Sequence, residues 1–140
     1  MSIQFNNTFE SIDSEYGILK GNSVRYNTVL WSFTIWKENH SIDVFIEGNE
    51  TSLNPDYKKT LHSFLENIPD FMKTLHIHLL NMVSQNDSFA TFMKNSYFIE
   101  SITIWDEEYD ITIVDEFRNQ QIIVNMLENN ILDIYIENTN

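Results

Sequence analysis

The sequence predicts an α+β domain, in which an antiparallel sheet, made of an N-terminal hairpin and a C-terminal meander, carries two or three central helices packed on one face. Apolar residues alternate with polar ones near both ends of the chain, which is typical of half-buried strands. In the middle they recur every three or four residues, as in amphipathic helices. Short polar breaks separate the alternating segments. We therefore expect residues 1–140 to form a single domain, with 1–15 irregular.

The first strands are predicted at residues 28–36 and 42–47. Apolar side chains alternate in both segments, and the polar residues 37–41 between them are short enough for a β-hairpin. Upstream, residues 16–20 and 23–26 are expected to add one or two edge strands, because Gly17 and the pair Gly21-Asn22 supply turn chemistry.

A helical segment begins at Asn54-Pro55, since Asn is a good N-cap and Pro is tolerated at the first helical position. Apolar residues continue at helical spacing to about Ser84. Pro69 interrupts this segment, so either a second helix begins there or the first helix kinks. Residues 89–94 are expected to form one further helical turn.

The last third of the chain alternates again in four segments. The first contains Ile102, the second Tyr109, Ile111 and Ile113, the third Ile122 and Val124, and the fourth Leu132 and Ile134. Polar breaks at 106–108, 117–120 and 128–130 separate them. Strands joined by such short connections pair as an antiparallel meander.

The composition excludes several classes of function. The chain has no cysteine, so disulfides, thiolate zinc sites and cysteine nucleophiles are absent, and a cytoplasmic location fits. Its three glycines match no phosphate-binding fingerprint. A net charge of −13 repels phosphate backbones, which argues against nucleic-acid and anionic-membrane partners. The first residues have neither a basic cluster nor an apolar run, so no signal peptide is expected.

The negative charge is concentrated in the C-terminal meander. Residues 1–50 carry −4, residues 51–94 carry zero and residues 95–140 carry −9. This meander is the candidate surface for a basic protein partner, with carboxylates that steer the partner and aromatic side chains that anchor it. The candidate residues are Trp105, Asp106, Glu107, Glu108, Tyr109, Asp110, Asp115 and Glu116. The alternative is a surface whose charge serves solubility alone.

The two acidic turns fall at opposite ends of a meander strand, so they form one surface only if other acids connect them. Asp110, Glu128, Asp133 and Glu137 are placed to do so along the polar face of the sheet. A second candidate surface is the outer face of the first hairpin, where Trp36 and Phe45 point away from the main apolar stripe and would support self-association. Alternatively, the helices cover that face.

No catalytic, metal or cofactor site is predicted. His76 and His78 are two apart in a predicted helix and so lie about 200° apart around its axis, which prevents them from chelating one ion. The acids at 106–110 lack the glycine and distal glutamate of a calcium loop, and no serine lies in a nucleophile motif. A small enzyme or ligand-binding domain, with a cleft between helices and sheet, would require a deep polar pocket that holds His76 or His78 beside a buried carboxylate.

The order of features resembles small acidic bacterial α+β domains of unknown function, some of which are immunity proteins that neutralise toxins. The residues that carry the resemblance are 31–36, 42–48, the helix entry at 54–61 and the closing strand at 131–137. The resemblance implies a cytosolic bacterial protein that occludes the site of a cognate, basic toxin. We therefore expect a non-catalytic protein-binding domain of unknown oligomeric state, with a homo-oligomeric structural domain as a further alternative.

Overall fold

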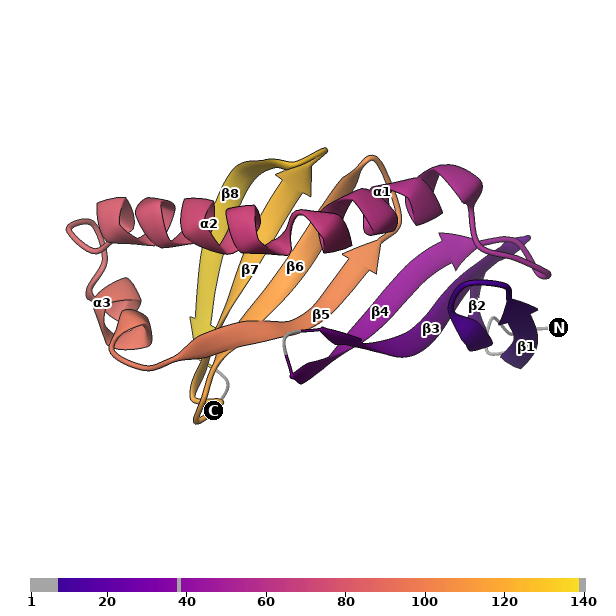
Figure 1. The fold of residues 1–140 in the computed structure, drawn as a ribbon, viewed down its shortest axis with the longest axis horizontal. Helices are drawn as coiled ribbons and strands as arrows, with labels where there is room; N and C mark the ends of the chain where they lie inside the picture. The colour runs from indigo at the N-terminus through magenta and orange to yellow at the C-terminus, as the bar shows by residue number, and fades with distance from the viewer. Residues whose placement is uncertain (1–7, 38, 139–140) are drawn as a thin grey trace, which may run out of the picture.

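A computed structural model describes residues 8–37 and 39–138. Eight strands form one sheet, and each strand lies beside its neighbours in the sequence, in the order β1 to β8 (Figure 1). The strands are β1 (Thr8–Asp13), β2 (Gly17–Arg25), β3 (Thr28–Lys37), β4 (His40–Gly48), β5 (Tyr97–Ile104), β6 (Glu108–Asp115), β7 (Gln120–Leu127) and β8 (Asn130–Asn138). The three helices, all between β4 and β5, are α1 (Pro55–Glu66), α2 (Ile68–Met82) and α3 (Asp87–Met93).

The predicted fold class is wrong in two respects. The fold is mostly sheet, with helices in 26% of the described residues, and the sheet is mixed because β4 and β5 run parallel. The N-terminal part is also larger than a hairpin, since β1 and β2 extend it to a four-stranded meander. Segment 1–15, which was expected to be irregular, contains β1, and residues 1–7 of it lie outside the described residues.

The parallel pair follows from the connection between the two meanders. Residues 49–96 leave β4, run through the three helices and return to the end at which β4 began. Strands joined by a tight turn must be antiparallel, whereas a long crossover allows the second strand to run in the same direction as the first. Local periodicity predicts each strand but carries no information about this direction.

Asparagine side chains begin the first and third helices. Asn54 Oδ1 accepts the backbone N–H of Asp56 at 2.9 Å and that of Tyr57 at 3.3 Å, while Pro55 occupies the first turn. Asn86 caps α3 in the same way through the N–H of Ser88. These contacts satisfy backbone donors that have no partner within the helix. Pro69 lies in the first turn of a separate helix, which decides between a break and a kink.

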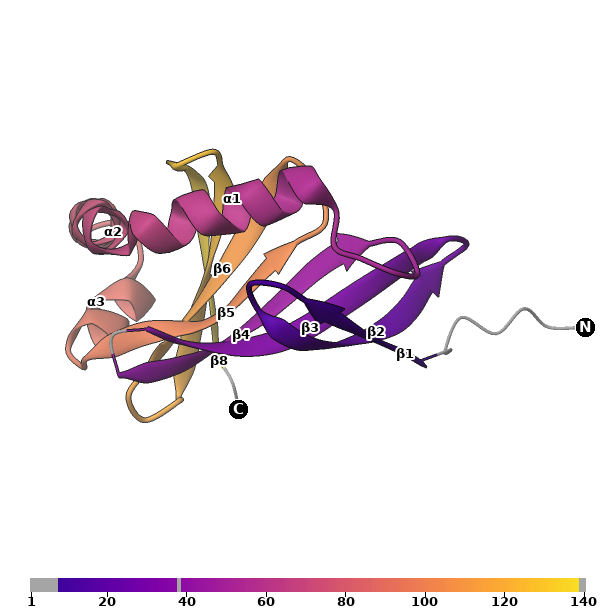
Figure 2. The ribbon, with the colours of Figure 1, turned by 45° about the vertical axis from the view of Figure 1, so that its right-hand side comes forward.

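The core lies between the helices and one face of the sheet. α1 and α2 cross the same side of the sheet in both views (Figures 1 and 2). Alternate residues of the strands point toward them and are buried, among them Trp31, Val44, Ile102 and Tyr109. Buried side chains from the helices, including Phe64, complete the core. We call this side of the sheet the covered face and the other side the uncovered face.

The loop after β4 packs directly against the buried Trp31. The indole Nε1 donates a hydrogen bond to the carbonyl oxygen of Asn49 at 2.9 Å. A Cβ at Gly48 would lie 2.2 Å from the carbonyl oxygen of Ser52, so only glycine fits this close approach of two backbone segments. The loop therefore fixes where α1 begins relative to the sheet.

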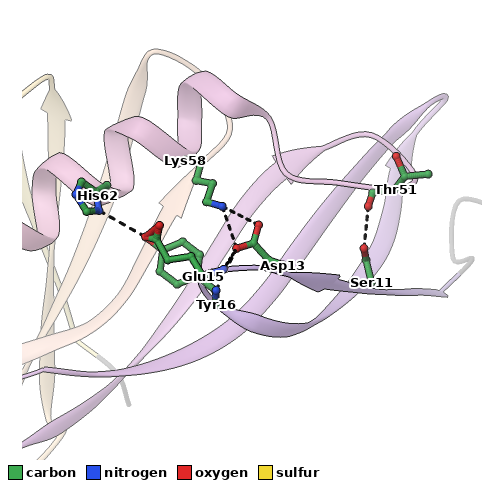
Figure 3. A network of polar contacts seen from close by, with 7 residues as sticks. All are labelled: Ser11, Asp13, Glu15, Tyr16, Thr51, Lys58 and His62. Carbon is green, nitrogen blue, oxygen red and sulfur yellow. Dashed lines mark hydrogen bonds and ion pairs between the residues drawn. The ribbon is translucent and has the colours of Figure 1, made fainter.

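Polar contacts attach the β1–β2 hairpin to α1 (Figure 3). Lys58 Nζ lies 2.9 Å from both carboxylate oxygens of Asp13, and His62 Nδ1 lies 3.5 Å from Glu15. The Ser11 hydroxyl donates to the carbonyl oxygen of Thr51 at 2.8 Å. The hairpin thus lies against the start of the helical layer.

Candidate functional site

The uncovered face is the side of the sheet that the helices leave open. One row of this face crosses all eight strands, because residues paired between neighbouring strands point to the same side. The row reads Glu10, Lys20, Ser32, Phe45, Thr103, Asp110, Asn125 and Asp133. The row contains one apolar side chain, Phe45, whereas the covered face directly beneath it is apolar.

Carboxylates outnumber cations on the uncovered face. Its acidic side chains are Glu10, Asp43, Glu47, Glu100, Glu108, Asp110, Asp133 and Glu137, and its basic side chains are Lys20, Arg25 and Arg118. Two of the cations are already in ion pairs, Arg25 with Glu47 at 2.9 Å and Arg118 with Glu100. A basic partner therefore meets a surface with an excess of negative charge.

An acidic corner lies where β5 ends. Its carboxylates are Glu47, Asp106 and Glu107, around the indole of Trp105, which is 52% exposed. The charges of these carboxylates act on the pKa of the nearby Tyr57 hydroxyl. Burial raises the pKa of Tyr57, and the negative charges of these three residues raise it further.

A hollow of about 430 Å³ adjoins the indole in this corner. Its lining combines the apolar side chains of Val24 and Leu30 with Trp105, Asp106 and the ion pair of Arg25 with Glu47. An aromatic face beside carboxylates suits a lysine or arginine side chain, through cation–π and charge attraction together. Arg25 is in this environment already, with 67% of its side chain exposed.

An acidic strip continues from the corner across β6, β7 and β8. It consists of Glu108, Asp110 and Asp133, and Asn125 of β7 lies between the two aspartates and donates a hydrogen bond to Asp110 at 3.1 Å. The exposed Tyr135 is next to the strip. A side-chain hydrogen bond with Asp133 raises the pKa of Tyr135, and the charges of Asp133, Asp110 and Glu108 add to the effect. We call the corner and the strip together the acidic–aromatic face.

The structure brings together five of the eight predicted partner-binding residues. Trp105, Asp106 and Glu107 are exposed at the turn between β5 and β6, and Glu108 and Asp110 follow on the uncovered side of β6. Glu116 is exposed too, but it lies in the turn after β6, at the opposite end of the strand. It is therefore separate from the acidic–aromatic face.

Tyr109 and Asp115, in contrast, are buried and make contacts within the fold. Tyr109 is 1% exposed on the covered face, and its hydroxyl donates to the carbonyl oxygen of Glu128. Asp115 is equally buried and accepts the N–H groups of Asn119 at 2.8 Å and Gln120 at 3.1 Å, which closes the β6–β7 turn. Neither side chain offers surface to a partner.

Trp36 and Phe45, predicted as a self-association surface, both lie on the uncovered face. The helices cover the other side of this hairpin, which answers the question that the sequence left open. Trp36 is 74% exposed and faces Ser41, whereas Phe45 is half-buried and lies four residues further along β4. Self-association through them stays a prediction.

The histidines are dispersed over the structure. His76 Nδ1 lies 3.2 Å from the Tyr97 hydroxyl at an open groove, and the buried carboxylate of Asp115 does not line that groove. Across residues 8–37 and 39–138, no group of three or more histidine and carboxylate side chains is placed to hold a metal ion. None of the helices there is long and apolar enough to cross a membrane.

Sequence reasoning did not select Glu47, Tyr135 or the lining residues Val24, Arg25 and Leu30. The alternation of side chains along β6 could have shown that two of the selected residues are buried. Tyr109 and Asp115 share the parity of the buried Ile111 and Ile113, which indicates the covered face. The approach of β2 and β4 to Trp105, in contrast, depends on the parallel pairing and has no local signal.

Comparison of the chain with protein-family models, curated proteins and solved structures finds no match. The physical properties of the surface therefore carry the functional argument.

Proposed function

We propose that this chain is a non-catalytic protein-binding domain whose acidic–aromatic face binds a basic protein. The observation that carries the proposal is the clustering of Glu47, Asp106, Glu107, Glu108, Asp110 and Asp133 around two exposed aromatic rings on a sheet face without helices. Exposed aromatic side chains supply contact area, and carboxylates steer a basic partner into register.

The more specific proposal is an immunity-type inhibitor that acts in the cytoplasm by occluding the site of a basic toxin. The resemblance noted for residues 31–36, 42–48, 54–61 and 131–137 suggests this class, and the net charge of −13 suits steering toward a basic enzyme. A rigid strand face can cover a concave site without rearrangement of its own backbone.

A pull-down from the native host tests the proposal, with three forms of the full chain as bait. The test variant is Glu107→Lys/Glu108→Lys, and the matched control, with the same change of net charge, is Glu66→Lys/Glu116→Lys on other surfaces. A protein captured by the wild type is identified, purified and titrated against all three forms by calorimetry at low and high salt.

We expect a basic protein that the wild type and the control bind alike and the test variant binds at least tenfold more weakly, since each reversed rim charge costs about 1 kcal/mol or more. High salt should weaken wild-type binding. Equal affinity of the test variant and the wild type would overturn the assignment of the face. A captured enzyme that stays active in the complex would overturn the inhibitor proposal alone.

A further inference from the structure

The sheet divides at the end opposite Trp105. β4 and β5 pair only over residues 43–46 and 101–104, although β4 begins at His40 and β5 begins at Tyr97. A bulge between Ile99 and Ser101 shifts the register of β5 against β6, and bulges bend the strand that contains them. The first residues of the two strands therefore face each other across a gap in the ladder.

A pocket occupies this gap. Its volume is about 200 Å³, and its walls come from three elements, namely the end of the β3–β4 hairpin, the start of β5 and one side of α2. The lining residues are Lys37, His40, Ile42, Ile68, Met72, Tyr97, Phe98 and Ile99. The volume lies below the roughly 300–1,000 Å³ of pockets for drug-sized ligands, so the occupant must be small.

The pocket combines an apolar interior with a positive charge. Ile42, Ile68, Met72 and Ile99 supply aliphatic walls, whereas Lys37 is the residue with a permanent charge among the lining residues that the structure describes. This lysine stands out because acids dominate the chain as a whole.

The aromatic side of the pocket is ordered by ring contacts. The rings of His40 and Phe98 stack across the gap, with centroids 4.5 Å apart and an angle of 2° between their planes. The Arg118 guanidinium lies 5.6 Å from the Phe98 centroid and is paired with Glu100. Arg118 is not among the described lining residues, whereas Lys37 is. A flat apolar group can stack in such surroundings.

We propose that this pocket binds a small monocarboxylic acid with an aromatic or short aliphatic body. The body displaces water from the apolar walls beneath α2, and the carboxylate pairs with the Lys37 ammonium at the rim. One cation suits a monoanion, and pairing at a partly apolar rim is stronger than in open water. The pocket lies at the start of β5 and Trp105 follows its end, with residues 100–104 between them, so the two sites are separate.

The test is an NMR titration of the full chain with sodium benzoate and sodium hexanoate, each compared with its neutral amide. Saturable shifts are expected in residues 37–42, 68–72 and 97–99, with a dissociation constant of about 1 mM or lower. Each amide should bind about tenfold more weakly, because it cannot pair with the ammonium.

Two variants locate the interaction. Lys37→Met should weaken binding of the carboxylates about tenfold and leave the amides unchanged, whereas Lys59→Met, on the exposed surface of α1, should change neither. Met72→Trp should fill the pocket and abolish binding of both classes. If that variant is misfolded, Lys37→Met alone decides, because its side chain is at the surface.

The absence of saturable shifts would overturn the proposal, as would shifts elsewhere or equal affinities for acid and amide. An unchanged affinity of Lys37→Met for benzoate would also overturn it. None of these results affects the proposal for the acidic–aromatic face.

Discussion

The C-terminal meander and the β1–β2 hairpin hold the same helical layer by different means. The C-terminal meander packs apolar side chains against α1 and α2, for example Tyr109 against Phe64, with ring centroids 6.0 Å apart. The β1–β2 hairpin of the N-terminal meander instead makes partly exposed polar contacts with α1, of which the pair of Asp13 and Lys58 is the clearest (Figure 3). Apolar burial is insensitive to pH and salt, whereas ion pairs respond to both. We therefore expect global stability to depend on the C-terminal half and local, pH-dependent opening to occur in the hairpin.

The largest effect is predicted for Phe64→Ala. This ring is fully buried between α2 and the C-terminal meander, where it contacts Phe71 and Tyr109. Loss of a buried phenylalanine costs about 3–5 kcal/mol of unfolding free energy, which is a large part of a small domain's stability. Urea denaturation measures the loss. The matched control is Phe117→Ala, at a ring that is 64% exposed, and a similar loss there would contradict burial of the ring as the cause.

The second effect concerns the β6–β7 turn of the same half. Asp115→Ala leaves the partly buried N–H group of Asn119 and the buried one of Gln120 without their acceptor, at a cost of about 1–3 kcal/mol. Asp115→Asn retains one acceptor oxygen and should cost less. Urea midpoints for both variants check this order. Equal stability of Asp115→Ala and wild type would show that water replaces the carboxylate.

The sequence predicts those elements of the fold that have a local signal. Alternation predicts β3 to β8, and the Asn54-Pro55 pair predicts the start of α1, because these signals are local. β1 was missed because it lies at a sheet edge, where half of its residues are exposed and the alternation has little contrast. The parallel pairing of β4 with β5 was missed because it depends on contacts between residues 58 positions apart, such as Asp43 and Ser101.

The acidic–aromatic face was predicted only in part, because only some of its residues are neighbours in the sequence. The acids at 106–108 are adjacent in the chain, so their clustering is visible in the sequence. Glu47 and Tyr135 join them only through the order of the strands. Tyr109 was selected because it lies beside the acids, yet its register places it in the core.

A smaller, local effect is predicted for Lys58→Met in the hairpin. Partial burial tends to raise the pKa of Asp13, but hydrogen bonds from Lys58 and from the amides of Glu15 and Tyr16 outweigh it and hold the pKa below 3.8. The folded-state pKa is lowered, so the stabilisation is present above about pH 4 and lost as the pH falls through the folded-state value.

Lys58→Met should cost about 1 kcal/mol or less at neutral pH and make the remaining acid dependence shallower. Amide hydrogen exchange should accelerate in β1 and β2 and stay unchanged in β6 and β7. The control is Lys73→Met, at an exposed lysine of α2. Acceleration across the whole sheet would mean that the hairpin does not open independently.

The smallest effect should come from one hydroxyl group in each half. Tyr109→Phe removes the hydrogen bond to Glu128 and leaves a partly buried carbonyl without its donor, at a cost of about 1 kcal/mol. The Tyr16 hydroxyl is buried and makes no hydrogen bond of ordinary geometry with the described residues, although burial and the nearby Glu15 carboxylate raise its pKa; its ring stacks on Phe33 with centroids 4.8 Å apart. Tyr16→Phe keeps the stacked ring and removes the unpaired group, so its unfolding free energy should stay within about 0.5 kcal/mol of the wild type or rise. Because the two substitutions delete the same atom, the difference between their urea midpoints isolates the hydrogen bond. A larger loss for Tyr16→Phe than for Tyr109→Phe would mean that the hairpin contributes to global stability as much as the C-terminal meander does.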